Sequence, residues 1–242
     1  MKNTRNHKMA ARCLWLLLSL VCLLQTPVAA YRARENDGSA VEIYRHKENT
    51  QKKIALTFDD GPHPRYTPEI LEILDTYGIK ATFFVVGENA EHYPDTLEEV
   101  IRRGHEVGNH TYTHPHLICE NYTGLVEEIG RCESTIYRFG ECRTKYFRPP
   151  EGLVDTDVRV AASKLGYSVI LWNIDTRDWA HTPPAKIAAN VLSHVHSGDI
   201  ILMHDYIGHN SPTPEALRLI LPELLAQGYT FVRISELIGI NE

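Results

Sequence analysis

The sequence lacks an apolar run long enough to be a typical membrane span. Its apolar segment at 14–24 is shorter than the roughly 20 residues needed to cross a bilayer. Four basic residues precede this segment, and the small residues VAA follow it at 28–30. This order is typical of a cleaved signal peptide over residues 1–30, with an uncleaved N-terminal anchor as the alternative. We therefore expect a secreted or cell-surface protein with no stable membrane span after cleavage.

Basic residues are too few for a nucleic-acid-binding protein. Lys and Arg number 25 against 31 Asp and Glu, which gives a net charge of −6. Removal of residues 1–30 takes away four basic residues and no acidic one, so the net charge becomes −10. Because nucleic-acid binding needs a basic surface, this balance argues against a nucleic-acid partner.

Cysteine is scarce as well. Of five cysteines, Cys13 and Cys22 lie in the predicted signal peptide. The three that remain, Cys119, Cys132 and Cys142, are an odd number, so at least one stays free or pairs between chains. Cys132 with Cys142 is the more plausible pair, because Cys119 and Cys142 flank opposite ends of one predicted helix. Free thiols are the alternative.

The chain also lacks internal repeats, low-complexity tracts and any sign of a second domain. Its 242 residues, 43% of them hydrophobic, suit one globular domain with a sizeable core. Residues 31–53 are polar and have no sustained period, so we interpret them as a leader segment with one short strand at 41–44. The main domain is expected over 54–242.

From residue 54 onward, short β-rich runs alternate with stretches of helical period. The predicted strands are 54–58, 81–86, 105–109, 145–149, 168–174, 199–204 and 229–234. The predicted helices are 67–77, 94–103, 124–137, 156–165, 184–196 and 214–226. This alternation implies parallel strands joined by crossover helices, and seven strands indicate an α/β barrel one strand short of the familiar eight.

Polar side chains gather where these strands end. In parallel barrels, the loops at the carboxyl ends of the strands carry the chemistry. The polar residues at those positions are Asp59, Asp60, His110, His114, Arg148, Asp175, Asp178, His204 and Asp205. The predicted strands therefore bring one polar cluster together.

Part of this cluster fits a metal site. Two imidazoles and one carboxylate form a common catalytic zinc set that leaves a coordination position open for water. Thirteen histidines give about 0.7 His-x3-His pairs by chance. His110 and His114 therefore indicate a metal site only in combination with the aspartates. The adjacent Asp59 and Asp60 are tolerable if a divalent cation binds one and an arginine or a substrate proton faces the other. The alternative for Asp-Asp-Gly-Pro is a plain turn.

At this point the residues resemble a known family. Five segments match, in order, the five motifs of the NodB-type polysaccharide deacetylases, carbohydrate esterase family 4. They are TFDDGP (57–62), HTYTH (110–114), RPPEG (148–152), DTRDW (175–179) and LMH (202–204). The resemblance extends over residues 54–237, and it implies a distorted (β/α)7 barrel.

The resemblance implies roles for the polar cluster. By it, Asp60, His110 and His114 ligate a divalent metal, with zinc expected and cobalt as the alternative. Asp59 is similar to the general base that activates the attacking water. Arg148 resembles the arginine that holds and tunes that base.

The later motifs imply the remaining parts of an active site. His204 is similar to the general acid that protonates the leaving amine. Asp178 is the better candidate to orient it, and Asp175 is the alternative. Trp179 and Leu202 resemble the walls of the pocket that receives the acetyl methyl group.

The third motif departs from the family pattern. The oxyanion donor expected there is a backbone N–H just after Pro150. Glu151 stands where the family usually has an aromatic residue, commonly tyrosine. We expect Glu151 to influence substrate choice through a hydrogen bond to a sugar hydroxyl or amine, and the alternative is a solvated loop glutamate.

The sequence thus predicts a metal-dependent, monomeric de-N-acetylase whose catalytic domain spans 54–242. Its expected partner is a polymer of N-acetylglucosamine, either cell-wall peptidoglycan or a chitin-like chain. An O-acetyl esterase acting on a xylan-type glycan would use the same groups. A catalytically silent glycan-binding protein is a further alternative, against which the intact base, ligands and acid argue.

Overall fold

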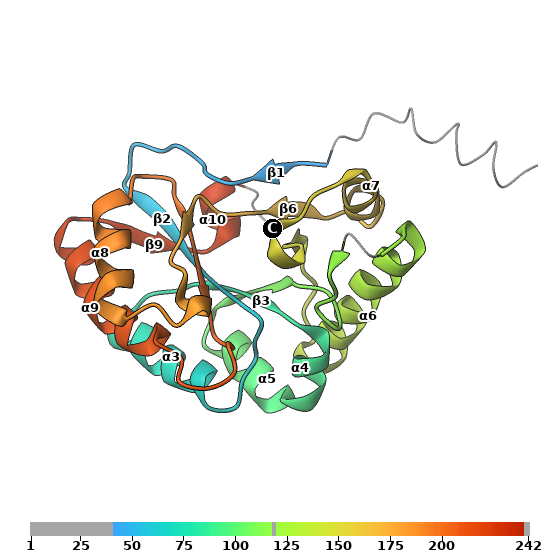
Figure 1. The fold of residues 1–242 in the computed structure, drawn as a ribbon, viewed down its shortest axis with the longest axis horizontal. Coiled ribbons are helices and arrows are strands. Elements are labelled where there is room, and N and C mark those ends of the chain that lie inside the picture. Colours follow the sequence, from blue (N-terminus) through green and yellow to red (C-terminus); the bar gives the residue numbers. More distant parts are fainter. Residues whose placement is uncertain (1–40, 118–119, 240–242) are drawn as a thin grey trace, which may run out of the picture. The chain divides into compact units, whose positions relative to one another are not determined.

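Helices surround a curled sheet of parallel strands in the computed structural model of this chain, which describes residues 41–117 and 120–239 (Figure 1). The strands are β1 (Ile43–Tyr44), β2 (Lys53–Asp59), β3 (Thr82–Val85), β4 (Glu106–Asn109), β5 (Tyr146–Phe147), β6 (Ser168–Ile170), β7 (Ile174–Asp175), β8 (Ile200–His204) and β9 (Thr230–Val232). The predicted signal peptide, the first part of the leader segment and Cys119 lie outside the described residues. The short strand expected at 41–44 is β1, which pairs with β6.

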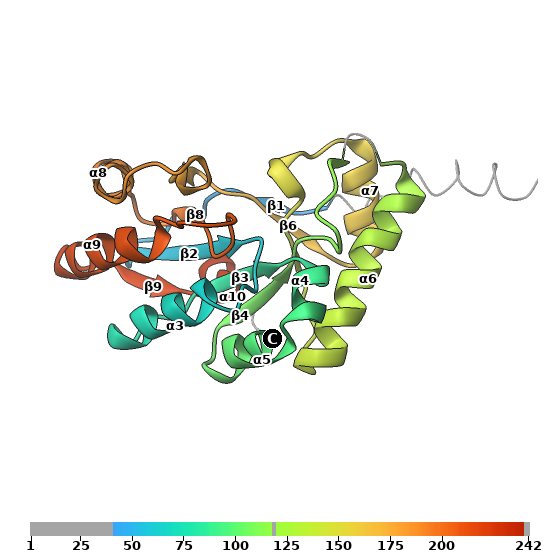
Figure 2. The same ribbon diagram turned by 60° about the horizontal axis from the view of Figure 1, so that its bottom comes forward.

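Most of the helices cover the outer side of the sheet, but Ile234, Leu237 and Ile238 pack in the cluster inside the barrel. The helices are α3 (Tyr66–Thr76), α4 (Gly87–His92), α5 (Pro94–Arg102), α6 (Tyr122–Gly140), α7 (Thr156–Lys164), α8 (Pro184–His194), α9 (Thr213–Ala226) and α10 (Ile234–Ile238), with short 3₁₀ turns η2 (Pro150–Gly152) and η3 (Asp178–Ala180). Figures 1 and 2 both show α8 and α9 at one side and α6 and α7 at the other. Among the described residues, no helix has the length and apolar character required to span a bilayer.

The strand order is β1-β6-β5-β4-β3-β2-β8-β7, and β9 also pairs with β2. Every pairing between these strands is parallel, and β2 lies at the centre with β3, β8 and β9 as neighbours. The curled parallel sheet and its outer helices confirm the predicted distorted (β/α)7 barrel.

One predicted strand is divided in two. The run at 168–174 forms β6 beside β5 and β7 beside β8, at opposite ends of the sheet. The backbone N–H of Leu171 donates to Tyr44 at 2.7 Å, whereas that of Asn173 donates to Ile200 at 3.2 Å. The chain therefore changes partners within three residues, and this crossing spans the gap between the two ends of the curled sheet.

Alternate side chains of β2 point to opposite faces of the sheet. Ile54, Leu56 and Phe58 pack against the outer helices in the largest core cluster. Ala55 belongs to a separate cluster inside the barrel, and residues two apart on a strand face the same side. Thr57 and Asp59 therefore point into the barrel interior with Ala55, which places Asp59 at the top of the enclosed core.

The predicted pairing of Cys132 with Cys142 is wrong. Cys132 has a free thiol, fully buried, whose Sγ donates to the Val85 carbonyl at 3.4 Å. Its helix, α6, turns this side chain inward against the sheet, where it packs as a small apolar group. Burial raises the pKa of the Cys132 thiol to about 12, so the group is not a reactive thiolate at neutral pH.

Candidate active site and metal centre

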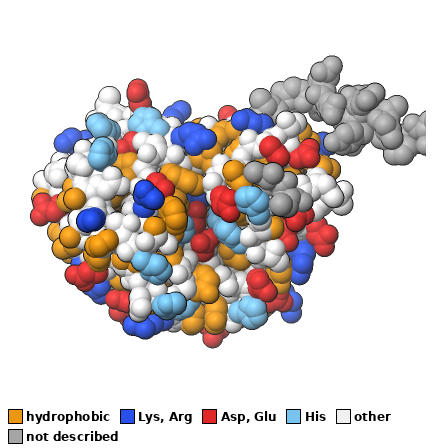
Figure 3. All heavy atoms as spheres, in the orientation of Figure 1, with side chains coloured by type: hydrophobic (Ala, Val, Ile, Leu, Met, Phe, Trp, Pro, Cys, Tyr) orange, Lys and Arg blue, Asp and Glu red, His pale blue; other side chains and the backbone are white. Residues whose placement is uncertain are grey.

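The predicted site residues gather at the carboxyl ends of the strands. Those that end or follow β2, β4, β5, β7 and β8 are Asp59, Asp60, His110, His114, Arg148, Asp175, Asp178 and His204. Figure 3 shows acidic and histidine side chains around a hollow near the middle of the visible face. Asp59 and His204 are directly paired positions on the neighbouring strands β2 and β8, so both side chains face the same side of the sheet.

A buried ion pair joins Asp59 to Arg148. Arg148 Nη1 lies 2.7 Å from Asp59 Oδ1, and both side chains are almost completely enclosed. Nη1 also donates to the Thr57 hydroxyl at 2.8 Å. Nε and Nη2 donate to the carbonyls of Ile170 and Leu171, at 3.1 and 3.3 Å, where the chain leaves β6. Burial lowers the pKa of Arg148 and Asp59 opposes that shift, so the guanidinium and the carboxylate hold each other in place.

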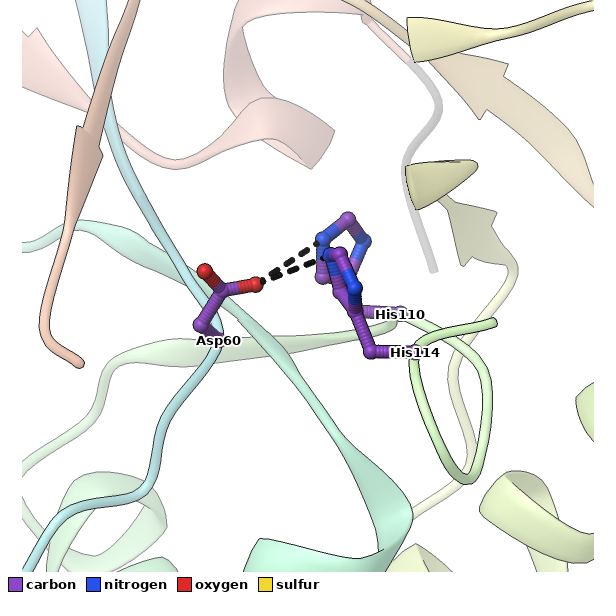
Figure 4. A group of neighbouring side chains, drawn as sticks. All are labelled: Asp60, His110 and His114. Atoms are coloured by element: carbon purple, nitrogen blue, oxygen red, sulfur yellow. Dashed lines mark ion pairs between the residues drawn. The ribbon is translucent and has the colours of Figure 1, made fainter. Parts of the chain in front are cut away.

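The second aspartate points away from the first, toward two histidines. Asp60 Oδ1 lies 3.3 Å from Nε2 of His110 and 3.3 Å from Nε2 of His114 (Figure 4). The three ligand atoms all lie within 4.8 Å of one another. Asp60 and His114 have φ values of 76° and 57°, in the left-handed region that few non-glycine residues occupy. The backbone is thus bent to bring these side chains together.

The chemistry of this group of three residues fits a divalent cation. His110 Nδ1 lies 2.6 Å from the Arg148 carbonyl, which can only accept, so Nδ1 carries a proton and Nε2 is the ring atom that faces Asp60. Asp60 Oδ1 is buried and has no hydrogen-bond partner among the described residues. A divalent cation between this oxygen and the two Nε2 atoms would be bound by all three. Asp60, His110 and His114 therefore form a candidate metal site.

His204 is held by one of the two candidate aspartates. Its Nδ1 lies 2.8 Å from Asp178 Oδ1, and its backbone N–H donates to Asp178 Oδ2 at 2.7 Å. Asp175 instead accepts from the backbone N–H of Arg177 at 2.8 Å and from Trp179 Nε1 at 3.4 Å. Burial alone would lower the pKa of His204, but its hydrogen bond to Asp178 and the charge of that carboxylate raise it to about 9. His204 is therefore an imidazolium at neutral pH.

The predicted substrate contacts surround this centre at different depths. Pro150 and Leu202 are buried, and Leu202 is the paired position of both Thr57 and Asp175. Trp179 is 49% exposed on η3. Glu151, with φ 58°, lies on η2 at the surface.

Two residues contact the candidate site that the sequence analysis did not assign to it. His116 Nδ1 lies 3.0 Å from Glu151 Oε2, and both side chains are exposed. Asn89 on α4 donates to the Asp60 carbonyl at 2.7 Å and so supports the bent backbone of that residue. Neither residue belongs to a motif, and each becomes visible only when distant segments are folded together.

The comparison with known proteins agrees with this geometry. The family model described as polysaccharide deacetylase matches residues 46–170. The chain belongs to the polysaccharide deacetylase family. A peptidoglycan N-acetylglucosamine deacetylase of Bacillus cereus is 40% identical over 192 residues, which are 78% of this chain and 90% of the relative.

Solved structures of polysaccharide deacetylase relatives have the same fold. The crystal structure of the Bc1960 peptidoglycan N-acetylglucosamine deacetylase has a TM-score of 0.79 and 34% identity, over 81% of this chain and 92% of that one. A family 4 acetyl xylan esterase from Clostridium thermocellum, in complex with a cobalt ion, has a TM-score of 0.72 and 33% identity, over 78% of this chain and 91% of that one. These findings confirm the predicted family, fold and enzyme class, a deacetylase.

Removal of one proposed ligand should weaken metal binding in this deacetylase without unfolding it. We expect His114→Ala to lower zinc affinity more than about tenfold, because loss of even an outer-shell partner costs about that much. The circular dichroism spectrum should be unchanged, since the barrel has its own apolar core. His116→Ala is the matched control, because His116 lies on the same loop but contacts Glu151. Equal zinc affinity of the two variants in equilibrium dialysis would contradict the ligand assignment.

Proposed function

We propose that this chain is a metal-dependent de-N-acetylase that hydrolyses the acetamido group of N-acetylglucosamine residues in a polysaccharide. The observation that carries this proposal is the placement of Asp59 and His204. They are paired positions on adjacent strands, beside the candidate metal site, and each is held by a buried partner of opposite charge. Amide hydrolysis needs one group that accepts a proton and another that donates one, and these two residues supply them.

Asp59 is the proton acceptor in this proposal. Its Oδ1 is engaged by Arg148, which leaves Oδ2 on the side of the candidate metal site, 3.7 Å from His110 Nε2. Oδ2 accepts the proton of the attacking water as the new bond to the acetyl carbon forms. The hydrogen bond from Arg148 Nη1 fixes the direction of this carboxylate.

His204 is the proton donor. Its Nδ1 is engaged by Asp178, so Nε2 carries the proton that moves to the sugar nitrogen as the carbon–nitrogen bond breaks. The Thr213 hydroxyl also donates to Asp178 at 2.7 Å, which fixes the orientation of the carboxylate. The backbone N–H of Glu151 is the proposed oxyanion donor, and Trp179 with Leu202 form the proposed acetyl pocket.

Asp60, His110 and His114 are the proposed ligands of zinc. Two imidazoles and one carboxylate are a frequent catalytic zinc set, and cobalt is the alternative. When bound, such a cation polarises a carbonyl and makes water more acidic.

The leaving group decides between two activities. A deacetylase protonates an amine leaving group, whereas an O-acetyl esterase releases an alcohol, and the His204–Asp178 pair can protonate either. The relative with 40% identity, which is named a deacetylase, favours the amide. The esterase is nevertheless a second candidate, because an acetyl xylan esterase has the same fold. A silent glycan-binding protein is disfavoured, because the proposed base, acid and ligands are all present. We infer an extracytoplasmic location, since a related enzyme is named for peptidoglycan.

Acetate release tests the proposed function. The protein, loaded with zinc or cobalt, should release acetate from chitotetraose faster than from acetylated xylan. A strong chelator should stop the reaction, and added metal should restore it. Preferential release from xylan would establish the esterase instead, and full activity in chelator would contradict the metal site.

Replacement of Glu151 should change substrate preference more than chemistry. The proposed oxyanion donor is a backbone N–H, which Glu151→Tyr retains, so kcat on a small acetylated substrate should stay within about tenfold. The variant loses the His116 contact and gains a flat ring at the surface of η2. The kcat/KM ratio between chitobiose and chitotetraose should therefore change. His116→Ala separates loss of the ion pair from gain of the ring, and an unchanged ratio in both variants would argue for a solvated glutamate.

A further inference from the structure

Four aromatic side chains, which we call the aromatic platform, are grouped around the ring of His63. They are His63, Tyr66, Tyr93 and Tyr206. The His63 ring is stacked on Tyr66 with centroids 5.0 Å apart and on Tyr206 with centroids 5.1 Å apart, while Tyr93 is tilted against it at 6.4 Å. His63 is three residues after Asp60, and Tyr206 is two residues after His204.

A buried carboxylate joins the two segments that carry the platform. Asp205, next to Tyr206, is fully enclosed and accepts from the Gly61 N–H at 3.0 Å and from the Thr67 hydroxyl at 2.6 Å. A Cβ at Gly61 would lie 2.0 Å from an Asp205 oxygen, so this approach requires glycine. The backbone N–H of His63 donates to Thr67 Oγ1 at 2.8 Å. The platform is thus fastened to the ends of β2 and β8 before any ligand binds.

The orientation and charge state of the His63 ring are also fixed. Its Nδ1 accepts from the backbone N–H groups of Arg65 and Tyr66, at 3.1 and 3.2 Å. Burial and the nearby Arg65 lower the pKa of His63, so the ring is neutral and its proton is on Nε2. The ring therefore adds one N–H donor to a set of apolar faces.

The outer rings of the platform are open to solvent. Tyr93 and Tyr206 are each 37% exposed, although tyrosine rings are large enough to favour burial. Exposed flat rings with polar edges, on the loops that also carry the proposed site residues Asp60 and His204, are typical of a ligand-binding surface. A pyranose ring matches this surface, because its C–H face packs on an aromatic ring while its hydroxyls bond to polar edges.

We propose that the aromatic platform is a binding subsite for a sugar ring next to the one that is deacetylated. The inference rests on the proposed function, because it takes the substrate to be a glycan chain. The metal ligands are on the segments that follow β2 and β4. The platform is carried by the segments after β3, β2 and β8, whereas His116 and Glu151 follow β4 and β5, toward the other end of the strand order. A glycan chain that crosses the candidate metal site therefore meets the platform on one side only, which gives it a direction.

Variants of Tyr206 test the subsite. Binding of chitotetraose to the metal-free protein, measured by calorimetry, should be about threefold to tenfold weaker in Tyr206→Ala, the range expected for loss of one ring contact. Tyr206→Phe keeps the ring and should bind within about twofold of the unchanged protein. Tyr137→Ala, at an exposed tyrosine on α6, is the matched control. In the metal-loaded protein, the ratio of kcat/KM for chitotetraose to that for 4-nitrophenyl acetate should fall about as much as binding.

The outcomes separate this inference from the proposed function. Equal binding of chitotetraose by Tyr206→Ala and Tyr137→Ala would overturn the subsite, even if the unchanged protein releases acetate. An equal loss of kcat/KM on both substrates would also overturn it, because the substitution would then act through His204. Weaker binding in Tyr206→Ala, with no acetate release by the unchanged protein from any glycan, would support the subsite and contradict the deacetylase. Tyr93→Ala provides a second measurement in the event that Tyr206→Ala does not fold.

Discussion

Asp59→Asn should lower kcat on an acetylated glycan about 10²-fold to 10⁴-fold, the usual contribution of a positioned general base. Asparagine has nearly the same shape, and its oxygen can still accept the hydrogen bond from Arg148 Nη1 that Asp59 Oδ1 accepts at 2.7 Å. Its amide nitrogen would then take the place of Oδ2 and cannot accept a proton. The variant should therefore fold and bind substrate while losing turnover.

Metal content distinguishes the two adjacent aspartates. Asp59→Asn should keep near-normal zinc, because the Asp60 carboxylate is the one that faces both His110 and His114. Asp60→Asn is the matched variant and should lose zinc together with activity. Both proteins should be assayed for acetate and for metal by mass spectrometry. Loss of zinc from Asp59→Asn alone would mean that the two roles have been exchanged.

The loss of charge at Asp59 should also have a structural cost. Arg148 is completely buried and Asp59 is the acidic group that faces it. Removal of one partner of a buried ion pair leaves an uncompensated charge, so Asp59→Asn should melt at a lower temperature. Turnover must therefore be measured well below that temperature, where the folded fraction is still complete.

Much of the fold follows from local pattern. The β-rich run at 54–58 predicted β2 and placed Asp59 at its carboxyl end, and each longer helix was predicted from its apolar period. The division of residues 168–174 was not predicted, because β6 and β7 share one apolar run and differ only in their distant partners. The six-residue α4 and the five-residue α10 are too short to have a recognisable period.

The candidate site was also predicted from the sequence only in part. Asp60, His110 and His114 come from ordered motifs, and the structure brings their ligand atoms together. The Asp205–Gly61 contact joins positions 144 residues apart and has no local sequence signal. The cysteine pairing failed for a similar reason, because the inward direction of Cys132 depends on which face of α6 the sheet covers.

The pH dependence of kcat should identify His204 as the acid. The protonated form donates, and its pKa is raised to about 9, so activity should be present below that pH and fall as the pH rises through it. A bound dication disfavours the imidazolium and moves this alkaline limb somewhat below pH 9. His204→Ala should remove the limb and lower kcat about 10²-fold to 10⁴-fold, with zinc content near normal.

Asp178→Asn tests the origin of that limb. The hydrogen bond and charge of Asp178 raise the pKa of His204 against the opposing effect of burial. Without the charge, the limb should move down by about 1–3 pH units, the usual effect of one close opposite charge. Asp175→Asn is the matched control, since Asp175 accepts hydrogen bonds from Arg177 and Trp179 instead. The alkaline limb of the pH profile of this variant should not move. A limb that moves equally in both variants would assign the alkaline titration to a group other than His204, because Asp178 is the acidic residue that contacts that imidazole in the described part of the chain.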